Sequence, residues 1–162
     1  MQIYIMRHGQ ANPVGAVDEL RSLNEMGELE VKKMALWAVS KNMNFDHVLV
    51  SPFLRAQQTS DLFLAEFTDK KPLKTQVEYI TPFGEASKVH DYIDAFISEN
   101  SIESLLIISH MPLVSFLSAE MTFDQSSPIF QTAAILHIDY DVDKMKGEAV
   151  TLTAPYDLED SS

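Results

Sequence analysis

The stretch Ile3-Tyr4-Ile5-Met6-Arg7-His8-Gly9 decides the fold that the sequence predicts. Residues 3–6 are all apolar or aromatic, with no polar residue alternating among them. This pattern is typical of a strand that is buried on both faces of a sheet. Arg7-His8-Gly9 ends the strand. The stretch therefore predicts an inner strand that carries two polar side chains at its carboxyl end.

Outward from this stretch, strands alternate with helices. Further strands are predicted at 46–50, 75–80 and 104–109, and helices at 25–41, 53–67, 85–99 and 112–121, with Asn24 capping the first helix. Two late strands, 133–140 and 148–153, predict an antiparallel hairpin. The alternation indicates a single three-layer α/β/α domain, whose sheet is mostly parallel with antiparallel strands from the C-terminal part of the chain. We expect this domain to span residues 1–155 and residues 156–162 to form an acidic flexible tail.

Composition narrows the function classes. The chain has 162 residues, enough for one domain, and 46% of them are hydrophobic, enough for a core without disulfides. The formal net charge of −12 disfavours nucleic acid and anionic membrane as partners. There is no cysteine, no apolar run of membrane-spanning length and no signal peptide after Met1. We expect a cytoplasmic protein, and a monomer because no heptad or apolar helix face suggests self-association.

Polar side chains gather at the predicted carboxyl ends of three strands. Arg7-His8 follows the first strand, His110 follows the strand at 104–109, and Arg55 lies in the first turn of the helix after the strand at 46–50. Ligands of such sheets bind at the carboxyl ends of the strands. The chain has nine lysines but only three arginines, and the guanidinium group is the better binder of phosphate oxygens. The sequence therefore predicts an anion site at this edge.

Two histidines and two arginines at one edge suit phosphoryl transfer. A neutral imidazole is a good nucleophile toward phosphorus, so His8 is the candidate for a phosphohistidine intermediate. A backbone carbonyl near Gly9 is expected to hold the other ring nitrogen protonated, and Gly9 to let the chain turn beside the phosphate. Arg7, Arg55 and His110 would hold the phosphoryl oxygens, helped by the positive end of the helix that begins near Phe53.

Four motifs carry a family resemblance. Arg7-His8-Gly9, Leu23–Gly27, Ser51–Thr59 and Ser109-His110 resemble, in the same order, motifs of the histidine phosphatase superfamily, the phosphoglycerate mutase-like proteins. The segments 80–85 and 108–114 are similar to the compact SixA-type phosphohistidine phosphatases. This resemblance implies the phosphoglycerate mutase-like fold. It also implies removal of phosphate from phosphohistidine on a protein, such as a histidine-containing phosphotransfer domain of a bacterial signalling protein, and it adds Arg21 to the substrate-binding residues.

The sequence also departs from the family pattern. Many members have asparagine where this chain has Val14, and Asn12 is a nearby but offset candidate for substrate binding. Many members carry a glutamate acid near the third strand, for which Glu78 and Glu85 are the candidates here. A phosphorylated imidazole leaves more readily than an alkoxide, so a phosphohistidine substrate needs a weaker proton donor. The chain lacks the long insertions that cover the site in larger members, which predicts an open cleft.

Other interpretations remain open at this point. His47, His90 and His137 lie outside the motifs and are expected to be structural or surface residues. Arg21 taken by itself favours a surface cation over a site residue, and only the family resemblance makes the two interpretations equal. No metal-ligand pattern and no cofactor motif is present in the sequence. Two alternative functions compete with the phosphohistidine phosphatase. One is a small-molecule phosphomonoesterase or mutase of the same family, and the other is a catalytically silent module that binds phosphoproteins.

Overall fold

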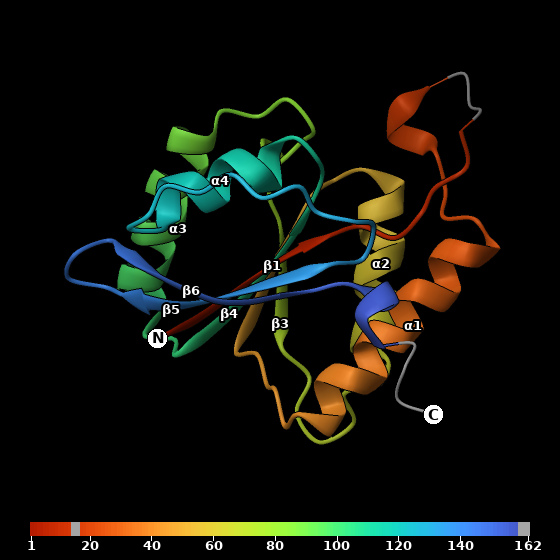
Figure 1. The fold of residues 1–162 in the computed structure, drawn as a ribbon, viewed down its shortest axis with the longest axis horizontal. Helices are drawn as coiled ribbons and strands as arrows, with labels where there is room; N and C mark the ends of the chain where they lie inside the picture. The colour runs from red at the N-terminus through yellow and green to blue at the C-terminus, as the bar shows by residue number, and fades with distance from the viewer. Residues whose placement is uncertain (14–16, 159–162) are drawn as a thin grey trace.

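A single six-stranded sheet lies between two pairs of helices in the computed structural model, which describes residues 1–13 and 17–158 (Figure 1). The strands are β1 (Gln2–Arg7), β2 (His47–Val50), β3 (Leu73–Gln76), β4 (Ser104–Ser109), β5 (Ile135–Asp141) and β6 (Lys146–Thr153). The helices are α1 (Glu25–Ser40), α2 (Leu54–Leu64), α3 (Ala86–Asn100) and α4 (Leu113–Met121), with short 3-10 turns η1 (Asp18–Leu20) and η2 (Pro155–Leu158). The predicted three-layer α/β/α domain is confirmed.

The order of the strands places the predicted site residues on neighbouring strands. The sheet runs β3-β2-β4-β1-β5-β6, with β1 to β4 parallel and β5 and β6 antiparallel to their neighbours. β1 pairs directly with β4, with Arg7 opposite Ser109, and β2 pairs with β4 on its other side. The carboxyl ends of β1, β4 and β2 therefore lie side by side at one edge of the sheet.

The inner strands are apolar on both faces because helices cover both faces. Alternate residues of β1 belong to different clusters: Ile3 and Ile5 pack with α3 and α4, whereas Tyr4 and Met6 pack with α1 and α2. In Figure 1, α3 and α4 lie on one side of the sheet and α1 and α2 on the other. Each fully buried Ile or Met contributes about 1.5–3 kcal/mol of burial energy. This two-sided packing explains the absence of polar alternation in residues 3–6.

Apart from shifts of one to three residues at the ends of other elements, the structure differs from the predicted elements at two places. β3 covers 73–76 rather than 75–80. The N–H of Val77 still donates to the carbonyl of Val50 at 2.9 Å, but beyond Val77 the chain leaves the sheet and buries Ile80 against α3 and α4. The first residues of the predicted tail form η2, where Asp157 Oδ2 accepts a hydrogen bond from the backbone N–H of Ala154 at 2.8 Å. Residues 159–162 of that tail lie outside the described residues.

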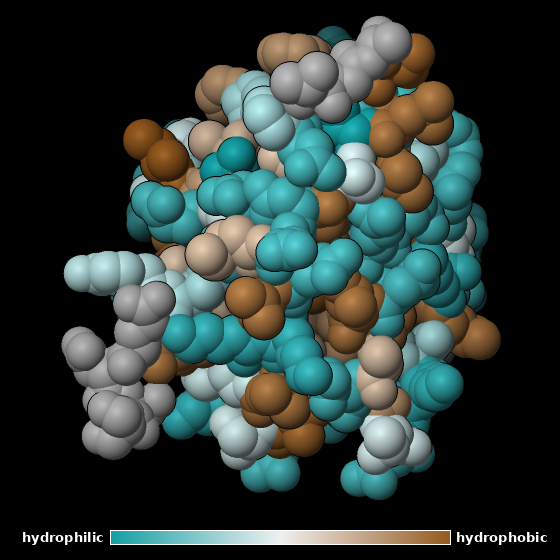
Figure 2. All heavy atoms as spheres, turned by 90° about the vertical axis from the view of Figure 1, so that its right-hand side faces the viewer, coloured by the Kyte–Doolittle hydropathy of each residue, from teal (hydrophilic) through white to brown (hydrophobic). Residues whose placement is uncertain are grey.

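The outer surface is mixed in character. Figure 2 shows the face to the right of Figure 1, where separate groups of apolar side chains lie among hydrophilic ones. α1 contributes Met26, Leu29 and Leu36 to the exposed apolar side chains. No helix in the described part of the chain is both long enough and apolar enough to cross a bilayer.

Candidate active site

Two imidazole rings meet where β1 and β4 end. The backbone N–H of His8 donates to the carbonyl of Ser109 at 3.0 Å, which continues the parallel pairing one residue beyond β1. His110 follows Ser109 directly. The rings of His8 and His110 are both buried, and their centroids lie 5.0 Å apart in an edge-to-face arrangement. The register of two parallel strands thus brings together residues that are a hundred positions apart in the sequence.

The hydrogen bonds of His8 define its tautomer. Nδ1 lies 2.7 Å from the backbone oxygen of Gly9, which can only accept, so Nδ1 carries the proton. Nε2 is then left with a lone pair, and Nε of Arg55 donates to it at 3.3 Å. Burial lowers the pKa of His8 to about 4, and the nearby charges of Arg55, Arg7 and Arg21 lower it too, against the opposing bond to Gly9. His8 is therefore neutral at pH 7, with Nε2 available as a nucleophile.

Arg55 is the third member of this group and comes from the first turn of α2. It is buried, and Asp18 holds its outer end: Nη1 donates to the backbone oxygen of Asp18 at 2.7 Å and Nη2 to Oδ2 at 3.2 Å. Asp18 lies on η1, in the loop between β1 and α1. The sequence offered no motif for this contact, because the two residues are 37 positions apart and η1 has no apolar periodicity.

Two buried nitrogens point to an anion site. Nη1 of Arg7 donates to the backbone oxygen of Phe130 at 2.7 Å, but Nε of Arg7 and Nδ1 of His110 have no hydrogen-bond partner in the described protein. Buried polar atoms normally have hydrogen-bond partners, and Arg7 is close enough to His110 to lower its pKa. These two unpaired nitrogens therefore indicate a binding site for a ligand with acceptor atoms. Burial lowers the pKa of His110 to about 2, and the neighbouring His8 and the arginines act in the same direction. His110 is therefore neutral as well.

Gly9 is required by a close approach rather than by a turn. A Cβ on Gly9 would lie 2.8 Å from the backbone oxygen of Gly27 and 2.8 Å from Cγ2 of Val31, both on α1. No glycine in the described residues has a positive φ, so Gly9 is needed for the space beside α1 and not for its backbone angle.

Asn24 caps α1 as predicted. Its side chain accepts a hydrogen bond from the N–H of Gly27 at 2.8 Å, which places the start of α1 against the loop that carries His8.

Two further predicted substrate-binding residues lie in the loop before α1. Arg21 forms an ion pair with Asp18 (Nη1 to Oδ1, 2.9 Å) and is close enough to lower the pKa of both His8 and His110. The side chain of Asn12 instead donates to Oγ of Ser22 at 3.0 Å, across the loop. The structure therefore links Arg21 to the site through Asp18 and places the Asn12 side chain in a contact within the loop. Val14, at the position where many family members carry asparagine, lies outside the described residues.

The two predicted proton donors lie at the surface. Glu78 accepts a hydrogen bond from Nε2 of Gln76 at 2.6 Å, and Glu85 pairs with Lys88 at 2.9 Å. Within residues 1–13 and 17–158, neither carboxylate has a hydrogen bond to His8, Arg55 or His110. The geometry does not bring a glutamate to the two histidines, and the identity of a proton donor stays a prediction.

The remaining histidines make contacts away from His8. His47 Nε2 lies 2.6 Å from Oγ1 of Thr75, His90 Nε2 lies 2.8 Å from the hydroxyl of Tyr140, and His137 stacks on Tyr4. These partners all belong to strands of the sheet. Among the described residues there is no group of three or more His, Cys, Asp or Glu side chains that could hold a metal ion.

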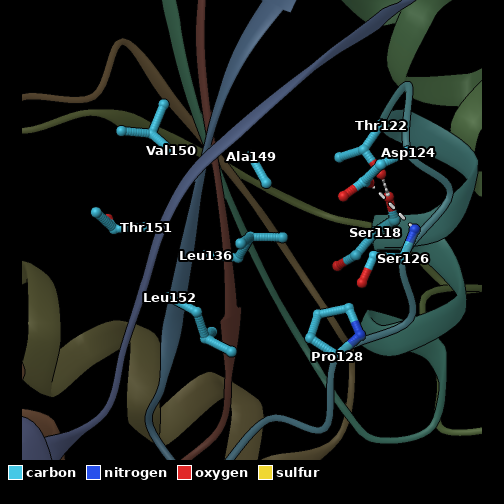
Figure 3. A pocket seen from close by; sticks show the side chains of 10 residues that line it. All are labelled: Ser118, Thr122, Asp124, Ser126, Pro128, Leu136, Ala149, Val150, Thr151 and Leu152. Carbon is cyan, nitrogen blue, oxygen red and sulfur yellow. Dashed lines mark hydrogen bonds between the residues drawn. The ribbon is translucent and has the colours of Figure 1, made fainter.

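A separate pocket lies between the edge of the sheet and the segment after α4. Figure 3 shows Leu136 and Ala149 on one side of it and Ser118, Thr122, Asp124, Ser126 and Pro128 on the other. Its ten lining residues include no histidine and no arginine. This pocket therefore has none of the groups that surround His8.

The arrangement at the carboxyl edge suits one kind of chemistry. It combines a neutral imidazole whose Nε2 carries no proton, and faces Nε of Arg55, with arginine and imidazole nitrogens that can donate to anionic oxygens. Such a group can hold a tetrahedral anion while a nitrogen nucleophile attacks its centre. The fold and the site together define an α/β phosphoryl-transfer protein that has histidine at its centre.

Comparisons with known proteins agree with this class. Residues 3–78 match the family described as the histidine phosphatase superfamily, branch 1. The chain is 40% identical to the phosphohistidine phosphatase SixA of Escherichia coli K12 over 87% of this chain and 86% of that protein. It is 33% identical to the SixA homolog of Haemophilus influenzae, over 89% and 91% of the two chains. The chain belongs to the histidine phosphatase superfamily and, within it, to the enzymes of the SixA type.

A solved structure supports the same assignment. The protein histidine phosphatase SixA, solved in complex with tungstate, superposes with a TM-score of 0.91 at 34% identity, covering 98% of this chain and all of that one. The predicted resemblance to the family, and to its SixA branch, is therefore confirmed.

Proposed function

We propose that this protein removes phosphate from phosphohistidine on a protein substrate, through a phosphohistidine intermediate on His8. The protonation state of His8 carries the proposal. Nδ1 is bonded to the carbonyl of Gly9 at 2.7 Å and the pKa is lowered to about 4, so the lone pair on Nε2 is available throughout the neutral range. A silent binding module has no need for such a nucleophile.

The reaction takes two displacements. In the first, Nε2 of His8 attacks phosphorus, the P–N bond to the substrate imidazole breaks, and the electron pair of that bond leaves with the imidazole, which takes up a proton from solvent. In the second, water attacks phosphorus, the bond to Nε2 breaks, and inorganic phosphate and a proton are released. Arg7, Arg55 and His110 hold the phosphoryl oxygens in both steps. Stabilisation of this kind is worth about 10²–10³-fold in rate for each donor.

The surface positions of Glu78 and Glu85 fit this substrate class. Ester hydrolysis releases an alkoxide, which needs a strong proton donor beside it. A phosphorylated imidazole is a better leaving group and takes its proton more easily. An enzyme for phosphohistidine can therefore work with no carboxylic acid placed against its two histidines.

The surroundings of the site favour a protein over a small molecule as the substrate. Three strongly exposed apolar side chains, which we call the apolar rim, are Leu20 (67% exposed), Phe83 (90%) and Ile129 (76%). Each belongs to a segment that contacts the site: Leu20 follows Asp18 on η1, Ile129 precedes Phe130, and Phe83 lies in the turn after Ile80, whose carbonyl accepts from Ser109 Oγ. Apolar side chains around a polar pocket are typical of protein interfaces.

We infer that the partner is a histidine-containing phosphotransfer domain of a bacterial signalling protein. Such a domain presents a phosphorylated imidazole on its surface, so the phosphoryl group can reach His8 while the surrounding surface of the domain rests on the apolar rim. Small-molecule phosphatase activity is the second candidate. It is favoured by the openness that the family pattern predicts for the cleft, since an open site also admits small phosphate compounds.

A trapping experiment tests the proposal. The protein is mixed with a phosphotransfer domain that carries radioactive phosphohistidine, and the reaction is stopped within one turnover. We expect an acid-labile, base-stable phosphate on the wild-type protein and none on His8→Ala. Binding without labelling would instead support the silent module. Faster turnover of sugar phosphates than of the phosphoprotein would support the small-molecule enzyme.

The apolar rim has its own test. Phe83→Ser is expected to lower kcat/KM for the phosphoprotein about tenfold, because aromatic anchors contribute much of the energy of an interface. Turnover of free phosphohistidine should not change. Leu73→Ser is the matched control, since Leu73 is 71% exposed at the amino end of β3, whereas the site lies at the carboxyl ends of the strands. Equal losses on both substrates would contradict a role of Phe83 in docking.

A further inference from the structure

Ser51 makes the one hydrogen bond that the ring of His110 has to the described protein. Ser51 is the first residue after β2, and its backbone N–H donates to the carbonyl of Ile108 at 3.1 Å, so it is fixed against the end of β4. Its hydroxyl oxygen lies 2.7 Å from Nε2 of His110. Both residues are buried. The contact therefore lies inside the protein, on the side of the His110 ring away from Nδ1.

The hydrogen bonds of the Ser51 hydroxyl determine its direction. The oxygen accepts from the backbone N–H of Phe53 at 3.2 Å, and its other partner is Nε2 of His110. A hydroxyl has one hydrogen, and the amide of Phe53 can only donate. If Nε2 were protonated, it would also donate to this oxygen, and the buried hydroxyl hydrogen would have no acceptor. Since leaving a buried donor unpaired is costly, the hydroxyl donates to Nε2.

This direction fixes the tautomer of His110. The ring is neutral, because burial and the neighbouring positive charges lower its pKa to about 2. A neutral imidazole whose Nε2 accepts must carry its proton on Nδ1. Nδ1 is the buried nitrogen that has no partner in the described protein, on a ring that lies against both His8 and Phe53 with centroids 5.0 Å apart in each case.

We propose that Ser51 is a positioning residue that holds His110 in its Nδ1–H tautomer and so makes it a neutral hydrogen-bond donor to a phosphoryl oxygen. The second half of this inference rests on the proposed function. In the other tautomer, Nδ1 would present a lone pair to an anionic oxygen and would repel it. Ser51 therefore contributes to catalysis without touching the substrate.

Nitrogen NMR of the wild-type protein tests the tautomer directly. In protein labelled with ¹⁵N at histidine, we expect the Nδ1 of His110 to show the shift of a protonated nitrogen and Nε2 that of an unprotonated one, at pH 7 and without added anion. The reverse pattern in the wild type would overturn the proposal. This measurement needs neither a substrate nor a variant that folds.

Three variants then link the tautomer to anion binding and turnover. Ser51→Ala should shift the His110 proton toward Nε2, weaken tungstate binding about tenfold and lower kcat by about 10–100-fold. This is less than the loss of about 10²–10³-fold for complete removal of one donor, because the His110 ring stays in place. Ser51→Thr keeps the hydroxyl and should restore the Nδ1–H signal and most of the activity. Ser60→Ala is the matched control, because Ser60 is a buried serine of α2 whose hydroxyl has no partner in the described protein.

The outcomes separate this inference from the proposed function. Wild-type kcat and tungstate affinity in Ser51→Ala, or equal losses in Ser60→Ala, would overturn the role of Ser51. If the wild type fails to hydrolyse a phosphorylated protein but Ser51→Ala still shifts the His110 proton and weakens tungstate binding, the proposed substrate is wrong and the role of Ser51 stands.

Discussion

Both terminal nitrogens of Arg55 donate hydrogen bonds to one residue, Asp18, which lies in the loop between β1 and α1. Nη1 bonds to the backbone oxygen at 2.7 Å and Nη2 to the carboxylate at 3.2 Å, while Nε faces Nε2 of His8 at 3.3 Å. Because a guanidinium group is planar and rigid, holding its outer end also aims its inner edge. Asp18 therefore orients Arg55 toward the nucleophile, but it also brings a negative charge close to an anion site.

The negative charge of Asp18 close to the anion site leads to a prediction for Asp18→Asn. The carboxylate is half exposed, so its repulsion of a bound anion is limited to about 0.2–1 kcal/mol. Removing the charge should tighten tungstate binding about two- to fivefold, while kcat falls because Arg55 is held less firmly. Calorimetric titration with tungstate and steady-state kinetics give the two numbers. Glu19→Gln removes the same charge from the next residue; an equal change there would assign the effect to overall charge.

Arg55→Lys tests the geometry of the guanidinium group. Lysine keeps the positive charge but has no Nε edge and no terminal fork, so it cannot bond to Asp18 and face His8 at the same time. We expect kcat/KM to fall by about 10²–10³-fold, with little change in the urea midpoint. Arg21→Lys should cost less, since Arg21 reaches the site through Asp18. Activity near that of the wild type in Arg55→Lys would argue against a planar contact with phosphate.

Gly27→Ala should reverse the usual effect of alanine in a helix. At an ordinary helical position this change stabilises by about 1 kcal/mol. On α1, however, the new Cβ would lie 2.0 Å from the backbone oxygen of Gln10, which follows Gly9. We expect a loss of about 2 kcal/mol or more in urea unfolding, together with lower activity, because the loop carrying His8 must move. Leu29→Ala, an exposed change on the same helix, should have a small effect on both; equal losses would point to the helix alone.

The sequence could predict the placement of His8 and His110 because a general rule covers it. Each follows a strand that is apolar throughout, and parallel strands bring their carboxyl ends to one edge. The tautomer of His8 was also within reach, since its partner is the next residue in the chain. The limits of β3 could not be predicted, because Ile80 looks like a strand residue but is buried by packing against helices, after the pairing with β2 has ended at Val77.

Asp18 and Ser51 show two different reasons for a missed site residue. Asp18 lies in a loop without periodicity, and its contact with Arg55 depends on how that loop folds back over α2. Ser51 did carry a signal, since it stands at the carboxyl end of β2, beside the strand that leads to His110. Asn12 has the right chemistry in the right loop, but a local bond to Ser22 directs its side chain within the loop.

The buried histidines also make stability depend on pH. An unfolded histidine has a pKa near 6.5, whereas burial and the neighbouring arginines lower that of folded His8 to about 4. Above pH 6.5, neither state binds a proton at this site, and its contribution to stability is complete. As the pH falls from 6.5 toward 4, the unfolded chain binds a proton that the folded protein does not, so the free energy of unfolding decreases. His110 acts in the same direction.

The size of this effect can be measured with His8→Asn. At pH 5, the shifted pKa of His8 lowers the free energy of unfolding by about 2 kcal/mol relative to pH 7, at 1.36 kcal/mol for each pKa unit. Other groups titrate over the same range, so the wild type alone does not isolate His8. Urea unfolding of both proteins at pH 7 and pH 5, without phosphate, should show that the variant loses about 2 kcal/mol less than the wild type. Equal losses would mean that His8 binds a proton as readily in the folded protein as in the unfolded chain, which would contradict a pKa lowered by burial.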